Sequence, residues 1–234
     1  MTTIADNLQE LRQRMAQACE RTGRDVTQVT LLAVSKTFGP EAVAEAVAAG
    51  QHAFGENYIQ EGVEKILALQ ELLPGQTLEW HCIGPVQSNK TRLVAAHFDW
   101  VQTVDRLKIA QRLSEQRPDG LAPLQVCLQV NVDGGANKSG VSPAELPELA
   151  QAVARLPHLR LRGLMCIPEP AADFEAARAV CQRARTLFDG LNTNGMHLDT
   201  LSIGMSADME AALAAGSTMV RVGRAIFGNR SART

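Results

Sequence analysis

The amino-acid sequence predicts a single-domain α/β fold, an eight-stranded parallel (β/α)₈ barrel of the TIM type. Apolar segments of strand length alternate with helical segments eight times in 234 residues, which gives about 29 residues per unit and falls within the size range of this fold. No composition shift, long linker or low-complexity segment divides the chain, so residues 1–234 are expected to form one domain. A doubly wound open sheet would need fewer units and a switch point that the sequence does not indicate.

The predicted elements follow one another along the chain. A helix over about residues 3–22 is expected to pack on the outside of the barrel, because apolar residues recur there at helical spacing. Residues 30–34 are nearly all apolar, which predicts a strand buried on both faces. The later strands are expected at residues 53–58, 78–84, 100–104, 124–132, 159–167, 201–205 and 219–223. The helices between the strands are expected at residues 41–49, 60–72, 91–97, 106–116, 143–155, 173–191 and 207–215.

Composition and charge exclude several classes of protein. The net charge is −2 with both signs mixed along the chain. The sequence has no basic patch interleaved with aromatic residues, the pattern that favours nucleic-acid binding. No apolar stretch approaches the roughly 20 residues of a membrane span, and residues 1–7 lack the pattern of a signal peptide. Five widely spaced cysteines and five histidines without a close pair argue against disulfides and a metal site. We therefore expect a cytoplasmic protein that binds neither membranes nor nucleic acids.

Lys36 follows the first predicted strand directly. A buried ammonium is costly unless it is paired, so Lys36 either extends into solvent, as most lysines do, or faces a pocket that alters its chemistry. Only five of the 23 basic residues are lysines, and Lys36 alone among them ends a core strand. We therefore favour the second alternative.

The active site of a (β/α)₈ barrel lies at the carboxyl ends of its strands. Polar and glycine residues gather at those positions in this sequence, and their shared position indicates a site more strongly than any one of them does. The candidate residues are Lys36, Asn57, His81, Met165, Ser202, Gly204, Met205, Ser206, Arg221, Gly223 and Arg224.

The segments after the seventh and eighth strands have the features of a phosphate site. Many barrels bind phosphate there through backbone N–H groups at a helix start. Gly204 and Gly223 allow the backbone to approach an anion closely, and Ser206 can donate a hydroxyl hydrogen bond. The alternative is that Ser206 only caps the following helix, and the two roles are compatible.

Arg221 alternates with Val220 and Val222, which predicts that its side chain faces the barrel interior. A guanidinium there needs partners, and a structural ion pair with an interior carboxylate is the alternative to a ligand contact. His81 is either a general acid or base or, more commonly for a lone histidine on a core strand, a satisfied core residue. Met165 is expected to pack.

A strand-end lysine, a phosphate site and an interior arginine together match the needs of pyridoxal 5'-phosphate, whose aldehyde condenses with a lysine amine. Several segments closely resemble the YggS/PROSC family of pyridoxal phosphate homeostasis proteins, and the resemblance spans nearly the whole chain. These segments are Ala-Val-Ser-Lys-Thr (33–37), Phe-Gly-Glu-Asn-Tyr (54–58), Trp-His-Cys-Ile-Gly-Pro-Val-Gln-Ser-Asn-Lys (80–90), Arg-Gly-Leu-Met-Cys-Ile (162–167), Leu-Ser-Ile-Gly-Met-Ser-Ala-Asp-Met (201–209) and Val-Arg-Val-Gly-Arg-Ala-Ile-Phe-Gly (220–228).

The resemblance implies a barrel like the N-terminal domain of alanine racemase. It also implies that Lys36 holds pyridoxal 5'-phosphate covalently as an aldimine, and that Arg221 lies by the pyridine nitrogen. The phosphate would be held by Ser206, Gly223 and Arg224, where the backbone N–H of Arg224 matters more than its side chain. Pocket-lining roles would fall to Asn57, His81, Met165, Ser202 and Met205.

The family resemblance favours a non-catalytic carrier or buffer in intracellular cofactor homeostasis, which would affect amino-acid metabolism. The alternative is a racemase-like enzyme. Related racemases take a tyrosine base from another subunit's β-domain, whereas this sequence ends shortly after its eighth strand and its one tyrosine, Tyr58, belongs to the second strand motif. A cation at the ring nitrogen also disfavours ring protonation and weakens carbanion stabilisation. Racemases tolerate such an arginine, so this argument counts only when joined to the missing β-domain.

The expected partners are pyridoxal 5'-phosphate, small amines and apo enzymes that receive the cofactor. A monomer is expected, because no second subunit is needed to complete the site. A regulatory interaction protein that only senses the cofactor is a third alternative. Lys138, in a glycine-flanked loop, either gates the pocket or is solvated, and we favour the solvated alternative.

Overall fold

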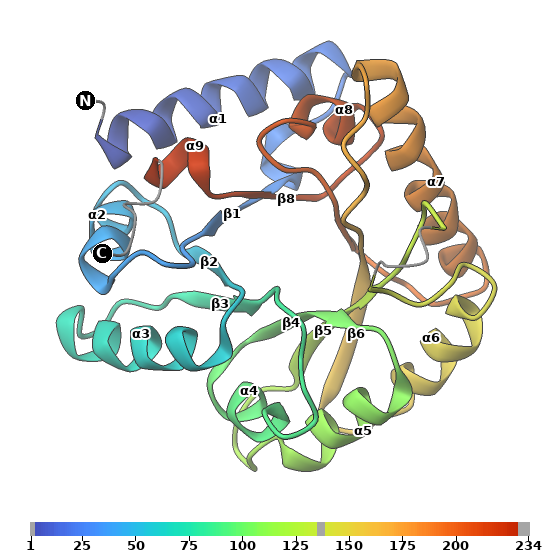
Figure 1. Cartoon of the computed structure of the whole chain (residues 1–234), viewed down its shortest axis with the longest axis horizontal. Coiled ribbons are helices and arrows are strands. Elements are labelled where there is room, and N and C mark those ends of the chain that lie inside the picture. The colour runs from blue at the N-terminus through green and yellow to red at the C-terminus, as the bar shows by residue number, and fades with distance from the viewer. Residues whose placement is uncertain (1–2, 135–138, 229–234) are drawn as a thin grey trace.

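The computed structural model describes residues 3–134 and 139–228, and within them eight parallel strands close into a barrel in chain order (Figure 1). This confirms the predicted (β/α)₈ fold. The strands are β1 (Thr30–Val34), β2 (Ala53–Glu56), β3 (Glu79–Cys82), β4 (Trp100–Val104), β5 (Leu124–Gln129), β6 (Leu159–Met165), β7 (Thr200–Ser202) and β8 (Met219–Val222).

Helices surround the barrel on its outer face, and α1 lies across the outside next to α8 and α9 (Figure 1). They are α1 (Ile4–Arg21), α2 (Pro40–Ala48), α3 (Ile59–Leu72), α4 (Thr91–His97), α5 (Leu107–Gln116), α6 (Leu146–Ala154), α7 (Phe174–Thr193), α8 (Met209–Ala214) and α9 (Arg224–Phe227), with a 3₁₀ turn η1 (Val26–Gln28) before β1. Within the described residues, none of these helices has the length and apolar character needed to cross a membrane.

Five strands end two or three residues earlier than the sequence predicts. Strand β2 ends at Glu56, β3 at Cys82, β5 at Gln129, β6 at Met165 and β7 at Ser202. Beyond these positions the backbone leaves the barrel ladder and forms the loops at the carboxyl mouth. Lys138 lies outside the described residues.

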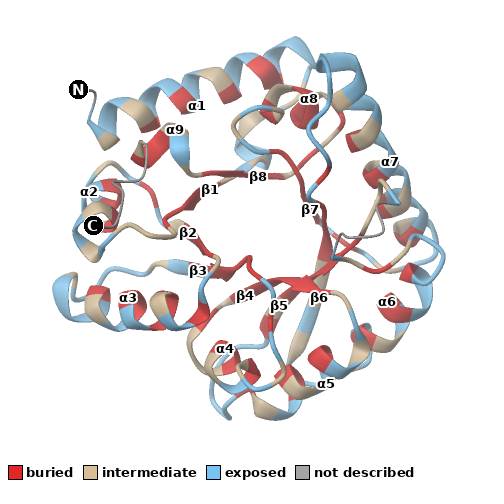
Figure 2. Cartoon of the chain, in the orientation of Figure 1, coloured by how far each residue is buried: buried red, intermediate tan, exposed pale blue. Residues whose placement is uncertain are grey.

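Most barrel-strand residues and the inner sides of the helices are buried (Figure 2), and the main core cluster is apolar. Strand β1 is buried only from its third residue onward, because Thr30 is exposed and Leu31 is half-buried. The expectation of a strand buried along its whole length was therefore wrong at its start, where the barrel opens to solvent at its amino end. The five cysteines are free and buried, and burial raises the pKa of Cys82 and Cys127 to about 12.

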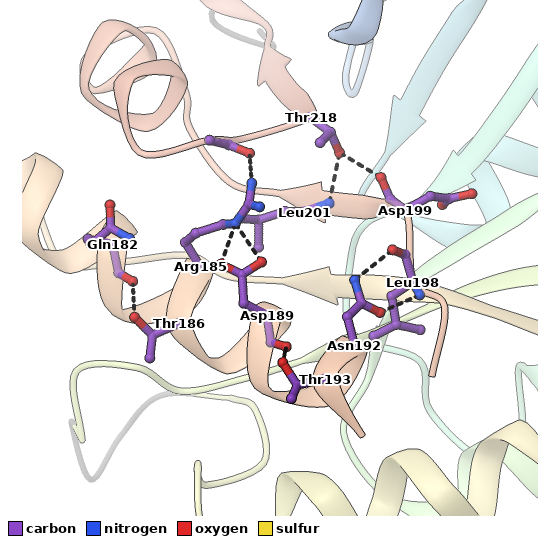
Figure 3. Close-up of polar contacts among 11 residues, drawn as sticks. Gln182, Arg185, Thr186, Asp189, Asn192, Thr193, Leu198, Asp199, Leu201 and Thr218 are labelled. Atoms are coloured by element: carbon purple, nitrogen blue, oxygen red, sulfur yellow. Dashed lines mark hydrogen bonds and ion pairs between the residues drawn. The ribbon is translucent and has the colours of Figure 1, made fainter. Parts of the chain in front are cut away.

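Side chains of Asn192 on α7 and of Thr218, just before β8, hold the segment that leads into β7 (Figure 3). Asn192 Nδ2 donates to the Leu198 carbonyl at 2.9 Å, and the Leu198 N–H donates to Asn192 Oδ1 at 2.6 Å. Thr218 Oγ1 accepts from the Leu201 N–H at 2.8 Å and donates to the Asp199 carbonyl at 3.3 Å. These bonds fix a short strand that pairs with β8 through a single register position.

Candidate functional site

Lys36 lies at the carboxyl mouth of the barrel, two residues beyond the end of β1. Strand β1 pairs with β8, with Leu32 opposite Arg221 and Ala33 opposite Val222. This register places the turn after β1 beside the turn after β8, because paired parallel strands end at the same edge. The Lys36 side chain is half-buried in this position.

A buried ion pair holds the residue that precedes Lys36. Lys65 on α3 has a side chain that is 3% exposed, and its Nζ donates to Glu56 Oε1 at 2.5 Å and to the Ser35 carbonyl at 2.8 Å. Ser35 Oγ donates to the same Glu56 oxygen at 2.6 Å. Burial raises the pKa of Glu56, and the Lys65 ammonium and the Ser35 hydroxyl act against that effect. Groups from three elements therefore fix one side of the lysine-bearing turn.

Thr37, which follows Lys36, has a left-handed backbone conformation with a φ of 70°. This conformation is costly for a β-branched residue. The Thr37 N–H donates to Glu61 Oε1 at 2.5 Å, and Lys65 Nζ lies 3.3 Å from that same oxygen. Strained positions of this kind cluster at functional sites. The turn that carries Lys36 is thus held on both sides.

Arg221 projects from β8 into the barrel interior, as the alternation along this strand predicts. The residue is 5% exposed, and its guanidinium donates to Ser202 Oγ at 2.7 Å and to the Cys166 carbonyl at 2.8 Å. Burial lowers the pKa of Arg221, but an arginine stays charged in proteins. No carboxylate of the described residues forms an ion pair with it. The alternative of an interior ion pair is therefore not observed there.

His81 lies inside the barrel with both ring nitrogens engaged. It is fully buried, and its ring stacks on Trp100 with the centroids 5.0 Å apart. Its Nε2 lies 2.8 Å from Glu79 Oε1 and its Nδ1 lies 2.9 Å from Gln102 Nε2. Burial lowers the pKa of His81, against the opposing effect of Glu79. Of the two alternatives, the satisfied core histidine is the one observed, and its nitrogens are not available to a ligand at the mouth.

Two further predicted residues, Met165 and Ser202, are fully buried inside the barrel. Met165 packs with Trp100 and Cys127, as expected. Ser202, at the end of β7, accepts from Arg221 and donates from its Oγ to Gln102 Oε1 at 2.6 Å. Ser202 therefore orients the arginine.

The turn after β7 depends on the glycine at position 204. Gly204 has a φ of +106°, in the left-handed region that favours glycine. A Cβ at this position would lie 2.6 Å from the Ala212 Cβ on α8. Any residue other than glycine at position 204 would therefore force this turn or α8 to move.

The next residues correct the expected start of the following helix. Helix α8 begins at Met209 with Asp208 as its N-cap residue, so the predicted start at residue 207 and the capping role of Ser206 are wrong. Asp208 Oδ1 accepts from the Met205 N–H at 2.7 Å and closes the turn. Within the described residues the Ser206 hydroxyl has no hydrogen-bond partner, and Met205 is 40% exposed beside it.

The turn after β8 contains Gly223 and Arg224. Gly223 precedes α9, a short helix that the sequence did not predict. A Cβ on Gly223 would lie 3.0 Å from the Val34 carbonyl oxygen, so this turn packs closely against the end of β1. The Arg224 side chain is exposed.

Three buried polar atoms near the lysine-bearing turn have no hydrogen-bond partner among the described residues: Thr37 Oγ1, Asn57 Oδ1 and Glu56 Oε2. Buried polar atoms are nearly always satisfied, so each exception calls for an explanation. Asn57 follows β2 directly and Thr37 lies three residues beyond β1, which places two of these atoms at the carboxyl mouth. A polar ligand bound at the mouth would account for them.

Sequence reasoning did not identify Lys65, Glu56 or Gln102. The signal for Glu56 was a carboxylate that ends a buried strand and so requires a cation nearby. The signal for Gln102 was a polar residue in the middle of the buried strand β4. Lys65 carries no local signal, because its position on the inner side of α3 depends on how the helix packs.

Comparison with known sequences identifies the family. The family described as alanine racemase, N-terminal domain, matches residues 3–231. A pyridoxal phosphate homeostasis protein of Escherichia coli K12 is 58% identical over 231 residues, which cover 98% of each chain. A protein of the same name from Pseudomonas aeruginosa PAO1 is 57% identical over 230 residues, which cover 98% of this chain and 97% of that one.

Solved structures share the fold. PipY of Synechococcus elongatus, solved with PLP bound, is 35% identical with a TM-score of 0.82, covering 97% of this chain and 100% of that chain. An alanine racemase of Clostridium difficile is 18% identical with a TM-score of 0.74, covering 97% of this chain and 58% of that chain. On these grounds the chain belongs to the family of pyridoxal phosphate homeostasis proteins, which carries the alanine racemase N-terminal domain.

Proposed function

We propose that this chain binds pyridoxal 5'-phosphate at the carboxyl mouth of its barrel and acts as a non-catalytic carrier or buffer of that cofactor. The observation that carries the proposal is the pairing of β1 with β8. It brings the lysine-bearing turn to the strand that holds Arg221, a buried cation with no carboxylate partner among the described residues. Such a site favours a ligand that is anionic or rich in lone pairs.

The residues at the mouth suit this cofactor group by group. The unpartnered Ser206 hydroxyl, the glycine turn at Gly223 and the N–H of Arg224 would hold the phosphate. The Arg221 guanidinium would donate to the pyridine nitrogen, and the Lys36 amine would bond to the aldehyde carbon with release of one water. The unpartnered oxygens of Thr37 and Asn57 would contact the polar substituents of the ring. Gly204, Met165, Ser202 and Met205 would shape and line the pocket.

When bound, the cofactor supplies an electrophilic carbonyl carbon and an electron-withdrawing ring. The chain would use its own residues to hold that group and to limit its reactivity. Lys36 would occupy the carbonyl carbon and so protect other amines from it. The fixed turn around Lys36 would keep the amine in place, and incoming small amines would release the cofactor by exchanging with Lys36.

Two observations support a non-catalytic role over a racemase. A cation at the ring nitrogen disfavours ring protonation and so weakens carbanion stabilisation, and Arg221 is the buried cation here. Racemases tolerate such an arginine, so this observation counts only together with the second. The Escherichia coli and Pseudomonas aeruginosa relatives, over nearly their whole length, carry a homeostasis name. The recipients we propose are apo enzymes that need this cofactor. We also propose that the protein is cytoplasmic and that it is a monomer. Light scattering, which measures the molar mass in solution, would test the monomer.

The test is a titration of the purified protein with pyridoxal 5'-phosphate, followed by absorbance, for the wild type and Lys36→Ala. The proposal expects a visible absorbance band in the wild type that is absent in Lys36→Ala but retained in the matched surface variant Lys108→Ala. D- or L-alanine is then added and its racemisation is assayed, with no turnover expected. Turnover would establish an enzyme, and the absence of any band in the wild type would refute the cofactor assignment.

A further inference from the structure

A continuous chain of hydrogen bonds crosses the barrel interior from Arg221 to the opposite end of the barrel. Arg221 donates to Ser202 Oγ at 2.7 Å, and Ser202 Oγ donates to Gln102 Oε1 at 2.6 Å. Gln102 Nε2 lies 2.9 Å from His81 Nδ1, and His81 Nε2 lies 2.8 Å from Glu79 Oε1. Ser202, Gln102 and His81 are each fully buried, so no water competes for these bonds.

The donors and acceptors permit one consistent direction along this chain. A guanidinium only donates, so the Ser202 hydroxyl proton points to the Gln102 oxygen. Gln102 Nε2 also lies 3.1 Å from the Met219 sulfur, which accepts and does not donate, and this places the amide nitrogen on the His81 side. His81 Nδ1 is therefore an acceptor, and the ring proton on Nε2 is donated to Glu79.

Glu79 ends the chain at a hollow of about 350 Å³ at the amino end of the barrel, which Trp100, Arg162 and Asp199 also line. Its side chain is 46% exposed. Burial acts to raise the pKa of Glu79, but hydrogen bonds from His81 and Trp100 and the charge of Arg162 outweigh it and hold the pKa below its usual value. A carboxylate thus accepts the last hydrogen bond, and hydrogen bonds in such a chain polarise one another.

We infer that Glu79, His81 and Gln102 are positioning residues, which act through Ser202 to hold the Arg221 guanidinium in the orientation that meets the ligand. This inference rests on the proposed function for the identity of the ligand. Arg221 donates two hydrogen bonds, to the Cys166 carbonyl just after β6 and to Ser202 on β7, which fix the plane of the guanidinium. The bond to Ser202 depends on the hydrogen bonds behind it. None of the three positioning residues touches the mouth itself.

The first test uses the apo protein and does not need the cofactor. ¹⁵N NMR of the histidine side chains, with His81→Gln used to assign the signal, should show His81 as the neutral Nε2-protonated form at neutral pH. Gln102→Glu replaces the donor to Nδ1 by an acceptor, so His81 Nδ1 should become protonated in that variant. A wild-type His81 protonated on Nδ1, or a Gln102→Glu variant with an unchanged signal, would overturn the inference.

The second test measures affinity and spectrum with pyridoxal 5'-phosphate itself. His81→Leu and Gln102→Leu break the chain, and each should weaken binding by about tenfold, the effect of one lost hydrogen bond, and shift the absorbance band. His81→Gln can accept from Gln102 and donate to Glu79, so it should recover most of the affinity and the wild-type band. Equal losses in His81→Leu and His81→Gln, or wild-type binding in His81→Leu, would refute a positioning role.

Thermal unfolding of each apo variant separates positioning from folding. If His81→Leu does not fold, Glu79→Ala at the exposed end removes the last acceptor without altering the buried packing. Glu79→Ala should also weaken the binding of pyridoxal 5'-phosphate. An unchanged affinity would contradict a positioning role for this row of hydrogen bonds. If the wild type binds no pyridoxal 5'-phosphate, the proposed function fails. The tautomer of His81 in the apo protein still decides whether the row of hydrogen bonds from Arg221 to Glu79 is present.

Discussion

Two lysines near the mouth of the barrel differ in how far they are buried. The Lys65 ammonium is 3% exposed and is held by Glu56 and the Ser35 carbonyl. Lys36 is half-buried and lies at the mouth, on a turn that these same groups fix. Lys65 is therefore a structural ion-pair partner that fixes the turn carrying Lys36, the lysine that we propose meets the ligand.

Replacement of Lys65 by methionine should therefore destabilise the fold. Lys65→Met leaves Glu56 buried without its cation, and the loss of one partner of a buried ion pair costs about 3–5 kcal/mol. Urea unfolding measures the change, with the exposed lysine in Lys108→Met as the matched control, for which we expect a change within about 0.5 kcal/mol. A loss in Lys65→Met no larger than in the control would contradict the structural role of this pair.

The buried His81 makes a prediction for the pH dependence of stability. Its pKa is lowered in the folded protein, so below about pH 6.5, the ordinary histidine pKa, the unfolded chain binds a proton that the folded chain does not. Stability should fall on acidification by up to about 1.4 kcal/mol per pH unit from this residue. Unfolding curves for wild type and His81→Gln between pH 7 and pH 5 isolate the effect, which should be smaller in the variant. Parallel curves would show that His81 does not stay neutral in the fold.

At the scale of single elements, a substitution in the turn after β7 tests whether glycine is needed at position 204. Gly204→Ala places a Cβ 2.6 Å from the Ala212 Cβ on a backbone with φ of +106°, and strain of this kind costs about 1–3 kcal/mol. Gly190→Ala, on the exposed side of α7 with no atom near the new Cβ, should instead stabilise by about 1 kcal/mol. Melting temperatures of the two variants should move in opposite directions, and a stabilised Gly204→Ala would show that this turn is not as close to α8 as described.

The ends of the elements illustrate what local sequence can and cannot predict. The spacing of apolar residues predicted the eight strands, but it did not predict where β5 stops. Val130 leaves the ladder and forms a bridge with Val141, and the N–H of Asn131 donates to the Val141 carbonyl at 3.0 Å. An apolar residue packed beside a loop looks the same in the sequence as an apolar residue in a strand. Where β5 ends therefore depends on Val141, which lies further along the sequence.

The same distinction holds for the site. Strand ends located Lys36 and Arg221, and alternation correctly oriented Arg221 toward the interior, because both follow from the geometry of one strand. The capping role of Ser206 failed because Asp208, two residues on, closes the turn instead. The Lys65 contact with Glu56 joins a helix to a strand, and no local pattern reports such a contact.

At the scale of the whole molecule, the closed barrel brings groups that are far apart in sequence to one mouth and one axis. The lysine-bearing turn follows β1, and the arginine that faces the interior belongs to β8, so the proposed site needs the first and last strands to pair. The polar chain behind Arg221 adds residues from β3, β4 and β7. If the proposed site is correct, closure of the barrel is a condition for binding as well as for stability.

The most direct measurement is to identify the lysine that bonds to the cofactor. The protein loaded with pyridoxal 5'-phosphate is reduced with sodium borohydride, digested and mapped by mass spectrometry, in parallel with Lys36→Ala. The account predicts a pyridoxyl adduct on Lys36 in the wild type and no adduct at any single site in Lys36→Ala. An adduct on Lys65, or one spread evenly over the exposed lysines, would contradict it.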